Sequence, residues 1–294
     1  MKYVSSFLLL MVVLLVLPID AVDFSGKWEI VQAKESRAKL IKTGSIITLS
    51  GDVIIRHDAD EYRADTVIIY EKEEIVVLHG SVKVLRRDAS VTADNCEYRS
   101  AQDAAIFTGN VIITQKNATI TGTRALIRTE TADIEVTGDV YFSQENYSGI
   151  ADYFYYNDTL QTIFLDGIPY IIFDDNYAGG DNMMIFLDNN GDIDRAEINL
   201  HADLFFRREN QDVQLYSEYM TIYFSNKNEP LYADLLRDVR VIMYEKEYIQ
   251  TMNGHTMRAD FEGKTVKTVF VKGNVSGSRK KREPSDEKNK PSKS

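Results

Sequence analysis

The chain has 294 residues, 44% of them hydrophobic, and a formal net charge of −11 from 34 basic and 45 acidic side chains. This length suffices for a large folded domain, and the acidic balance argues against a nucleic-acid partner, which requires a basic face. The single cysteine, Cys96, rules out an internal disulfide framework, so burial and backbone pairing must hold the fold together.

The segment 1–21 has the pattern of a secretory signal peptide. Lys2 supplies a basic start, an apolar run extends from Phe7 to Leu17, and Pro18 ends it, which predicts cleavage after Ala21. The alternative is an uncleaved membrane anchor. The run is shorter than the roughly 20 apolar residues that a membrane helix needs, which argues against this alternative. No cysteine follows the run, and a lipid-anchored lipoprotein is therefore not expected. These features predict an exported protein.

Glycines recur with a fixed 29-residue period through the middle of the chain, at Gly51, Gly80, Gly109, Gly138 and Gly167. A second landmark, a small residue followed by a polar one, keeps the same period: Ala64-Asp65, Ala93-Asp94, Gly122-Thr123, Ala151-Asp152 and Gly180-Asp181. A fixed period of this size indicates one supersecondary unit used repeatedly. Such arrays build extended surfaces more often than a compact catalytic pocket.

Apolar residues alternate with polar ones on both sides of each glycine, as in the stretch Phe107, Gly109, Val111 and Ile113. This period of two is typical of strands with one dry face, and a glycine inside a strand marks a bend or bulge. We therefore predict an all-β fold of long strands, each creased at its glycine. The aspartates of the second landmark are expected to satisfy backbone groups at turns, without a catalytic role.

The 29-residue period becomes irregular after Gly180, and the pattern of the two landmarks returns at Ala259-Asp260 and Gly273-Asn274-Val275. Asp188-Asn189-Asn190-Gly191 predicts a hairpin turn rather than a calcium loop, because position 199 is asparagine where the calcium pattern requires glutamate. No linker rich in proline or glycine divides residues 22–277, which predicts a single domain. Residues 278–294 carry a net charge of +4 and no apolar side chain except proline, so a disordered basic tail is expected.

The two landmarks together resemble the OstA-like family, which includes the periplasmic lipopolysaccharide transport proteins A and C and the amino-terminal part of the outer-membrane assembly protein D. The stretches 44–53 and 109–120 carry the resemblance best, and it extends over roughly 33–275. It implies an elongated, open twisted β-jellyroll in which creased antiparallel strands form a V-shaped trough. The implied function is non-enzymatic: a periplasmic bridge that carries lipopolysaccharide, or a similar amphipathic glycolipid, from the inner to the outer membrane.

The physical chemistry of acyl chains fits this function. Burial of one methylene contributes about 0.8 kcal/mol, so a long acyl chain requires a continuous dry path. The residues expected to line the trough, each of which has plain core packing as its alternative, are Val53, Ile55, Val76, Leu78, Val82, Val84, Phe107, Val111, Ile113, Val136, Val140 and Phe142. Phe107→Asp or Phe142→Asp is expected to block lipid passage more than folding. The open edges of such a sheet are expected to pair with other OstA-like proteins of the two membranes, or head to tail with a second copy.

Two other interpretations are weaker. Phe24-Ser25-Gly26-Lys27-Trp28 resembles the opening motif of lipocalins, but that short motif matches by chance and lipocalins have no 29-residue period. A parallel β-helix, as in secreted adhesins or scaffolds, also has a regular period, but it fits neither the change of step nor the hairpin turns. The four histidines lie far apart in the sequence without metal-ligand spacing, so neither a metal nor a cofactor is expected.

Overall fold

The computed structural model describes residues 28–41, 44–57, 60–86, 89–128, 131–144, 147–173, 175–189, 191–207, 212–225, 229–262 and 265–282. The expected signal peptide lies outside these residues, as does most of the expected lipocalin motif. Within them the fold is built from strands and one short 3-10 turn, Ser100–Gln102. No helix in this part of the chain is long and apolar enough to cross a membrane.

The chain divides into two compact units, which are described separately here. The N-terminal unit comprises 28–167 and 186–192, and the C-terminal unit comprises 168–185 and 193–282. Strand β14 (Asn182–Leu187) contributes residues to both units. The expectation of a single domain over 22–277 stays a prediction.

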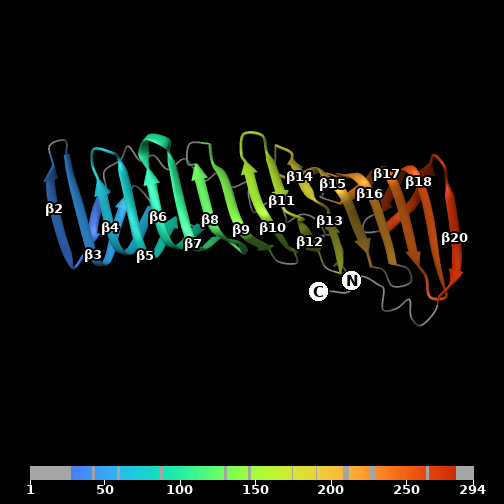
Figure 1. The fold of residues 1–294 in the computed structure, drawn as a ribbon, viewed down its shortest axis with the longest axis horizontal. Helices are drawn as coiled ribbons and strands as arrows, with labels where there is room; N and C mark the ends of the chain where they lie inside the picture. Colours follow the sequence, from blue (N-terminus) through green and yellow to red (C-terminus); the bar gives the residue numbers. More distant parts are fainter. Residues whose placement is uncertain are drawn as a thin grey trace, which may run out of the picture. The chain divides into compact units, whose positions relative to one another are not determined.

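The N-terminal unit is an antiparallel array in which each strand pairs with the next one in the sequence from β3 to β11 (Figure 1). Two short strands, β1 and β2, pair with opposite halves of β3. The strand bounds are β1 Trp28–Gln32, β2 Glu35–Ile41, β3 Gly44–His57, β4 Asp60–Tyr70, β5 Ile75–Arg86, β6 Ala89–Arg99, β7 Ala104–Gln115, β8 Ala118–Arg128, β9 Asp133–Gln144, β10 Tyr147–Asn157 and β11 Thr162–Asp166. Antiparallel pairing contradicts the parallel β-helix alternative and confirms the all-β fold of creased antiparallel strands.

Each repeated glycine forms the first half of a two-residue bulge. Gly80 and Ser81 both have positive φ, 76° and 48°, and the same holds for Gly109 and Asn110, at 77° and 45°. Between the pairs His79–Asn95 and Val82–Ala93, two residues of β5 stand opposite one residue of β6. The extra residue bends the strand, and the side-chain alternation resumes with the apolar residues still on the inner face. The glycines therefore divide every strand pair into two arms.

The second landmark lies across this bulge, not at a turn as the sequence suggested. A Cβ added to Gly80 would stand less than 3.0 Å from the carboxylate of Asp65, and one added to Gly109 would meet Asp94 equally closely. Asn110 Nδ2 also donates a hydrogen bond of 3.0 Å to Asp94 Oδ2. The prediction was wrong because the aspartate and the glycine belong to different strands, far apart in the sequence, and meet only through strand register.

The C-terminal unit is also an antiparallel array of strands, and four of its strands, β15 to β18, are 13 to 15 residues long. Its described strands are β12 Tyr170–Phe173, β13 Asn176–Gly179, β15 Ile193–Phe206, β16 Asp212–Phe224, β17 Pro230–Tyr244, β18 Tyr248–Glu262, β19 Thr265–Lys272 and β20 Ser276–Lys281. Strand β12 pairs with β13, β13 with β15, and β15 to β18 pair in succession, all antiparallel (Figure 1). Between β14 and β15, the Gly191 amide donates to the Asp188 carbonyl at 2.9 Å, where the sequence predicted a turn.

Two bulges of this unit contain no glycine. Leu200 and His201 have φ of 58° and 51°, and Arg237 and Asp238 have φ of 61° and 46°. The last bulge has its expected Gly273, but the residue over it is His255, so Ala259-Asp260 is not the second landmark of this unit.

The expected start of a disordered tail at residue 278 is too early. Strand β20 includes residues 278–281 and pairs with the first half of β18, from Tyr248–Lys281 to Asn253–Ser276. An edge strand needs backbone partners more than apolar side chains, and β18 supplies them. The Arg279 guanidinium carbon lies 4.0 Å from the Tyr248 ring centre, which adds a cation–π contact. Residues 283–294 lie outside the described part of the chain.

Candidate functional site

All twelve residues expected to line the trough lie on the inner face of the bulged strands β3, β5, β7 and β9. Ten are buried, and the other two, Val84 and Ile113, are half-buried. They flank the bulges on both sides, for example Phe107 before Gly109 and Val111 after it. The structure therefore brings them into one apolar interior, and their contact with lipid stays a prediction.

One row of inner side chains crosses nine consecutive strands on the first arm. It contains Leu49, Val67, Leu78, Cys96, Phe107, Ala125, Val136, Phe154 and Leu165, each directly opposite the next. None of them is more than 2% exposed. With strands about 4.8 Å apart, the row is on the order of 38 Å long. The row members on the even-numbered strands, Val67, Cys96, Ala125 and Phe154, were not predicted from the sequence as lining residues. Their constant spacing after the second landmark could have identified them as inward-facing.

A matching row crosses the second arm. It runs through Ile55, Tyr62, Val84, Val91, Ile113, Ile120 and Phe142. These side chains are buried or half-buried, and Gly149 stands opposite Phe142 at the end of the row. A Cβ on Gly149 would collide with the Phe142 ring, so this glycine makes room for the aromatic side chain.

The two arms touch each other through aromatic side chains. The ring centres of Phe142, on the second arm, and Phe154, on the first, are 6.3 Å apart. Trp28 lies 5.1 Å from Tyr62 and 6.4 Å from Tyr98, which belong to different arms. In this structure the interior is therefore filled by packed side chains, as protein interiors normally are.

The interior is dry enough to suppress ionisation. Burial raises the pKa of the Cys96 thiol far above its usual range. Burial also raises the pKa of Tyr62, with a further contribution from the nearby charge of Asp60. Among the described residues, no cluster of three or more histidine, cysteine, aspartate or glutamate side chains is placed to hold a metal ion.

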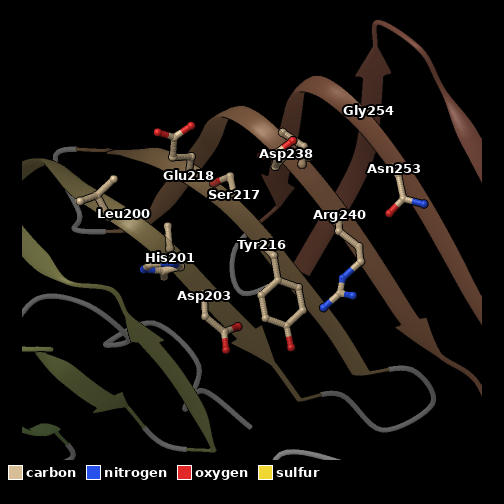
Figure 2. Close-up of a pocket in the computed structure, with 12 residues that line it drawn as sticks. Leu200, His201, Asp203, Tyr216, Ser217, Glu218, Asp238, Arg240, Asn253 and Gly254 are labelled. Atoms are coloured by element: carbon tan, nitrogen blue, oxygen red, sulfur yellow. The ribbon is translucent and has the colours of Figure 1, made fainter.

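A second, polar feature lies in the C-terminal unit. It is a groove of about 950 Å³ beside the bulges of β15 and β17, and Figure 2 shows its polar side chains along neighbouring strands. Asp203, Tyr216, Arg240 and Asn253 occupy directly opposite register positions on β15, β16, β17 and β18. The Arg240 guanidinium carbon lies 4.6 Å from the centre of the Tyr216 ring. Sequence reasoning missed this groove because its members come together only through strand register.

A buried hydrogen-bond network holds Asp203 in place. Gln214 Nε2 donates to both carboxylate oxygens, at 3.0 and 3.1 Å, and the Tyr177 hydroxyl donates to Oδ2 at 3.1 Å. Desolvation raises the pKa of Asp203 despite these donors and the charge of Arg240. Burial and the charge of Asp203 raise the pKa of Tyr216 to about 12.

Fold and interior together define an all-β protein whose creased sheet encloses a continuous apolar row. Residues 90–191 match the family described as LptA/(LptD N-terminal domain) LPS transport protein, which confirms the resemblance inferred from the sequence. The match covers strands β6 to β14, including much of the apolar row. The matched family is described as one of transport proteins and not of enzymes, in agreement with the expectation from the sequence.

A solved structure from Pseudomonas aeruginosa is among those similar to this chain. It is the crystal structure of LptH, described as the LptA homologous periplasmic component of the conserved lipopolysaccharide transport device. The two chains are 14% identical with a TM-score of 0.37, and the similarity covers 42% of this chain and 99% of LptH. No curated protein matches this chain.

Proposed function

We propose that this protein is a periplasmic bridge that carries lipopolysaccharide, or a similar amphipathic glycolipid, from the inner to the outer membrane. The observation that supports this most directly is the apolar row from Leu49 to Leu165, uninterrupted by any polar side chain across nine strands. The match of residues 90–191 to a lipopolysaccharide transport family supports the same cargo.

The packed interior sets a requirement on this function. An acyl chain has to replace side-chain contacts between the arms, such as the one between Phe142 and Phe154. Apolar contacts exchanged for apolar contacts cost little free energy, whereas exposure of the acyl chain to water costs about 0.8 kcal/mol per methylene. We infer that the arms separate along the crease when lipid enters and that the lipid's headgroup stays in water.

The sheet edges supply the proposed joints to partners. All of β2 except its last residue is exposed, and in the described structure β2 pairs with β3 alone, through Glu35–Ser50 to Ile41–Gly44. In the C-terminal unit, strands β19 and β20 pair with β18 and form one edge of the sheet. Edges of this kind accept an added strand from another OstA-like protein of the transport machinery, or from a second copy head to tail.

The first test is the lipid content of the protein purified gently from the periplasm of its own host as residues 22–294. Extraction followed by mass spectrometry is expected to find lipopolysaccharide or another long-chain glycolipid at near one molecule per protein. A well-folded protein free of lipid would count against the proposal.

The second test uses two adjacent residues that face opposite ways on β9. Phe142 is 8% exposed on the inner face, and Tyr141 is 43% exposed on the outer face. A photocrosslinking amino acid at position 142 is expected to form adducts with the lipid, whereas the same amino acid at position 141 is not. Equal crosslinking at both positions would show that the lipid does not occupy the interior.

A further inference from the structure

The polar groove of the C-terminal unit lies on the face of the sheet opposite its apolar core. Leu204, Leu215 and Val241, each next to a groove residue in the sequence, are at most 1% exposed. Because successive side chains of a strand point to opposite faces, Asp203, Tyr216 and Arg240 point away from this core. We propose that the groove is a saccharide-binding site for a neutral or amine-bearing sugar chain.

The row of groove side chains suits a polyhydroxylated ligand. Asp203, Tyr216, Arg240 and Asn253 stand on four neighbouring strands, so the row is about 14 Å long, enough for more than one sugar ring. The aspartate, arginine and asparagine side chains each present hydrogen-bonding atoms in one plane, which match adjacent hydroxyl groups. The tyrosine adds an apolar ring with a polar tip (Figure 2).

The site is organised before any ligand binds. Gln214, which is 3% exposed, and Tyr177 lie beside Asp203 on the same face of the sheet, two register positions along the strands, and their hydrogen bonds fix its carboxylate. Arg240 is held against the Tyr216 ring. Side chains locked by a second layer of hydrogen bonds lose little conformational entropy on binding, which distinguishes this groove from an ordinary polar surface.

The surroundings disfavour other ligand classes. The row from Asp203 to Asn253 is polar except for the Tyr216 ring, and the apolar lining residues Leu200, Ala202 and Val239 lie at or next to the two bulges. Three carboxylates, Asp203, Glu218 and Asp238, line the groove of a protein that carries a net charge of −11, and they oppose a polyanion. Two side chains near the groove already have polar partners: Arg237 Nη1 lies 3.3 Å from Glu218 Oε1, and His201 Nδ1 lies 3.0 Å from Asp181 Oδ1. A hydroxyl-rich ligand, with or without an amine, satisfies these groups best.

The source of the saccharide is the one point that rests on the proposed function. One source is the sugar headgroup of a transported glycolipid, and the other is a free saccharide. If a dephosphorylated glycolipid that carries the same sugar chain competes with the delipidated oligosaccharide for the groove, the headgroup is the source. If the oligosaccharide binds and this glycolipid does not displace it, the site takes free saccharides, and the groove proposal still stands.

The test is calorimetric titration of residues 22–294 with dephosphorylated, delipidated core oligosaccharide. Saturable binding is expected, weakened at least tenfold by Arg240→Ala and by Asn253→Ala. Arg258→Ala is the matched control, because Arg258 also lies over a tyrosine, Tyr232, at 4.3 Å, but outside the groove. The Arg258→Ala variant should bind the oligosaccharide with the same affinity as the unmodified protein.

Absence of saturable binding, or an equal loss in the Arg258 control, would overturn the groove proposal. The crosslinking result at position 142 is independent of this titration. If lipid crosslinks at 142 and no saccharide binds, only the groove proposal falls. If saccharide binds and no lipid crosslinks, the groove stands and the transport proposal falls. Melting curves of the variants, expected to be unchanged, show that any loss of affinity does not come from unfolding.

Discussion

The carboxylate of Asp94 lies directly over the α-carbon of Gly109, so that a Cβ on this glycine would stand less than 3.0 Å from Asp94 Oδ2. The same relationship joins Asp65 to Gly80 and Asp152 to Gly167. The two landmarks of the sequence are thus the two sides of one structural device. The glycine permits the left-handed backbone of the bulge, and the polar residue packs across it.

Gly109→Ala is therefore expected to destabilise the protein by about 2–3 kcal/mol, from the positive φ of 77° and the collision with Asp94. The free energy of unfolding from urea denaturation measures this effect. Combination with Asp94→Ala removes the contacts with the carboxylate but leaves the contact with the Cβ of residue 94, at 2.9 Å, and the backbone strain, so the double variant should recover about 1 kcal/mol relative to the sum of the single effects. Strict additivity would mean that the two residues are not coupled.

Ile168→Asn is expected to stabilise the protein by about 0.5–1 kcal/mol, because Ile168 has φ of 58°, which is costly for a β-branched residue. The side chain is 74% exposed, so little burial is lost. The residues at the equivalent bulge positions are Asp52, Ser81, Asn110 and Asp139. Ile150→Asn is the control: this exposed isoleucine lies within β10 and its φ is not positive, so asparagine there should be neutral or destabilising. The same response at both positions would show that backbone strain at 168 is not the cause.

Truncation distinguishes the last strand from the residues that follow it. A chain that stops after Arg282 should melt like the full chain, because β20 and the hydrogen bond from the Arg282 amide to the Glu247 carbonyl, 2.7 Å long, remain. A chain that stops after Val275 loses the pairing of β20 with Tyr248–Asn253 and should melt several degrees lower. Identical melting of the two truncated chains would show that β20 contributes no stability.

Cys96 reports on the interior. Its raised pKa and its 1% exposure predict that the native protein resists thiol reagents at pH 8 and reacts rapidly in denaturant. Because the pKa is raised in the folded state, the thiol's contribution to stability is complete below the unfolded pKa, near 9.0, and is lost as the pH rises above it. The stability difference between the unmodified protein and Cys96→Ala should therefore shrink from pH 8 to pH 10.5. A constant difference, or rapid labelling of the native protein, would contradict the buried placement.

Phe107→Asp and Phe142→Asp, which the sequence alone suggested would block lipid passage more than folding, are expected to impair folding as well. Phe107 and Phe142 are 2% and 8% exposed, so Phe107→Asp or Phe142→Asp would place an unpaired carboxylate in a packed interior. Both variants should lose stability by several kcal/mol, which makes them poor tests of lipid passage. The crosslinking pair at 141 and 142 avoids this difficulty.

The parts of the fold predicted from sequence are those that local pattern controls. Alternation around Gly109 predicted a creased strand with Phe107 and Val111 on one face, because the period of two and the need for a positive φ act over a short stretch of chain. The place of Asp94 was mispredicted because its partner, Gly109, lies on the neighbouring strand. The bulges at Leu200 and Arg237 were missed altogether, because no glycine marks them and the sheet itself imposes their backbone conformation.

The candidate sites differ in the same way. The interior was predictable because apolar side chains repeat at the period of the unit, so that Leu78, Phe107 and Val136 could be placed on one face from their spacing alone. The groove was not, because Asp203, Tyr216 and Arg240 lie in strands of unequal length, and only the strand register shows that they are neighbours.

The bulge occurs once for every two strands of the N-terminal unit, so each period of the sequence corresponds to one complete hairpin. Insertion or deletion of a whole period would change the length of the array by about 10 Å, because it adds or removes two strands. Every remaining strand would keep its original neighbour on at least one side. Duplication of a hairpin is therefore a modest genetic step with a fixed structural result. We expect proteins built on this plan to differ in reach by whole hairpins, which lets evolution fit the span to the gap that has to be crossed.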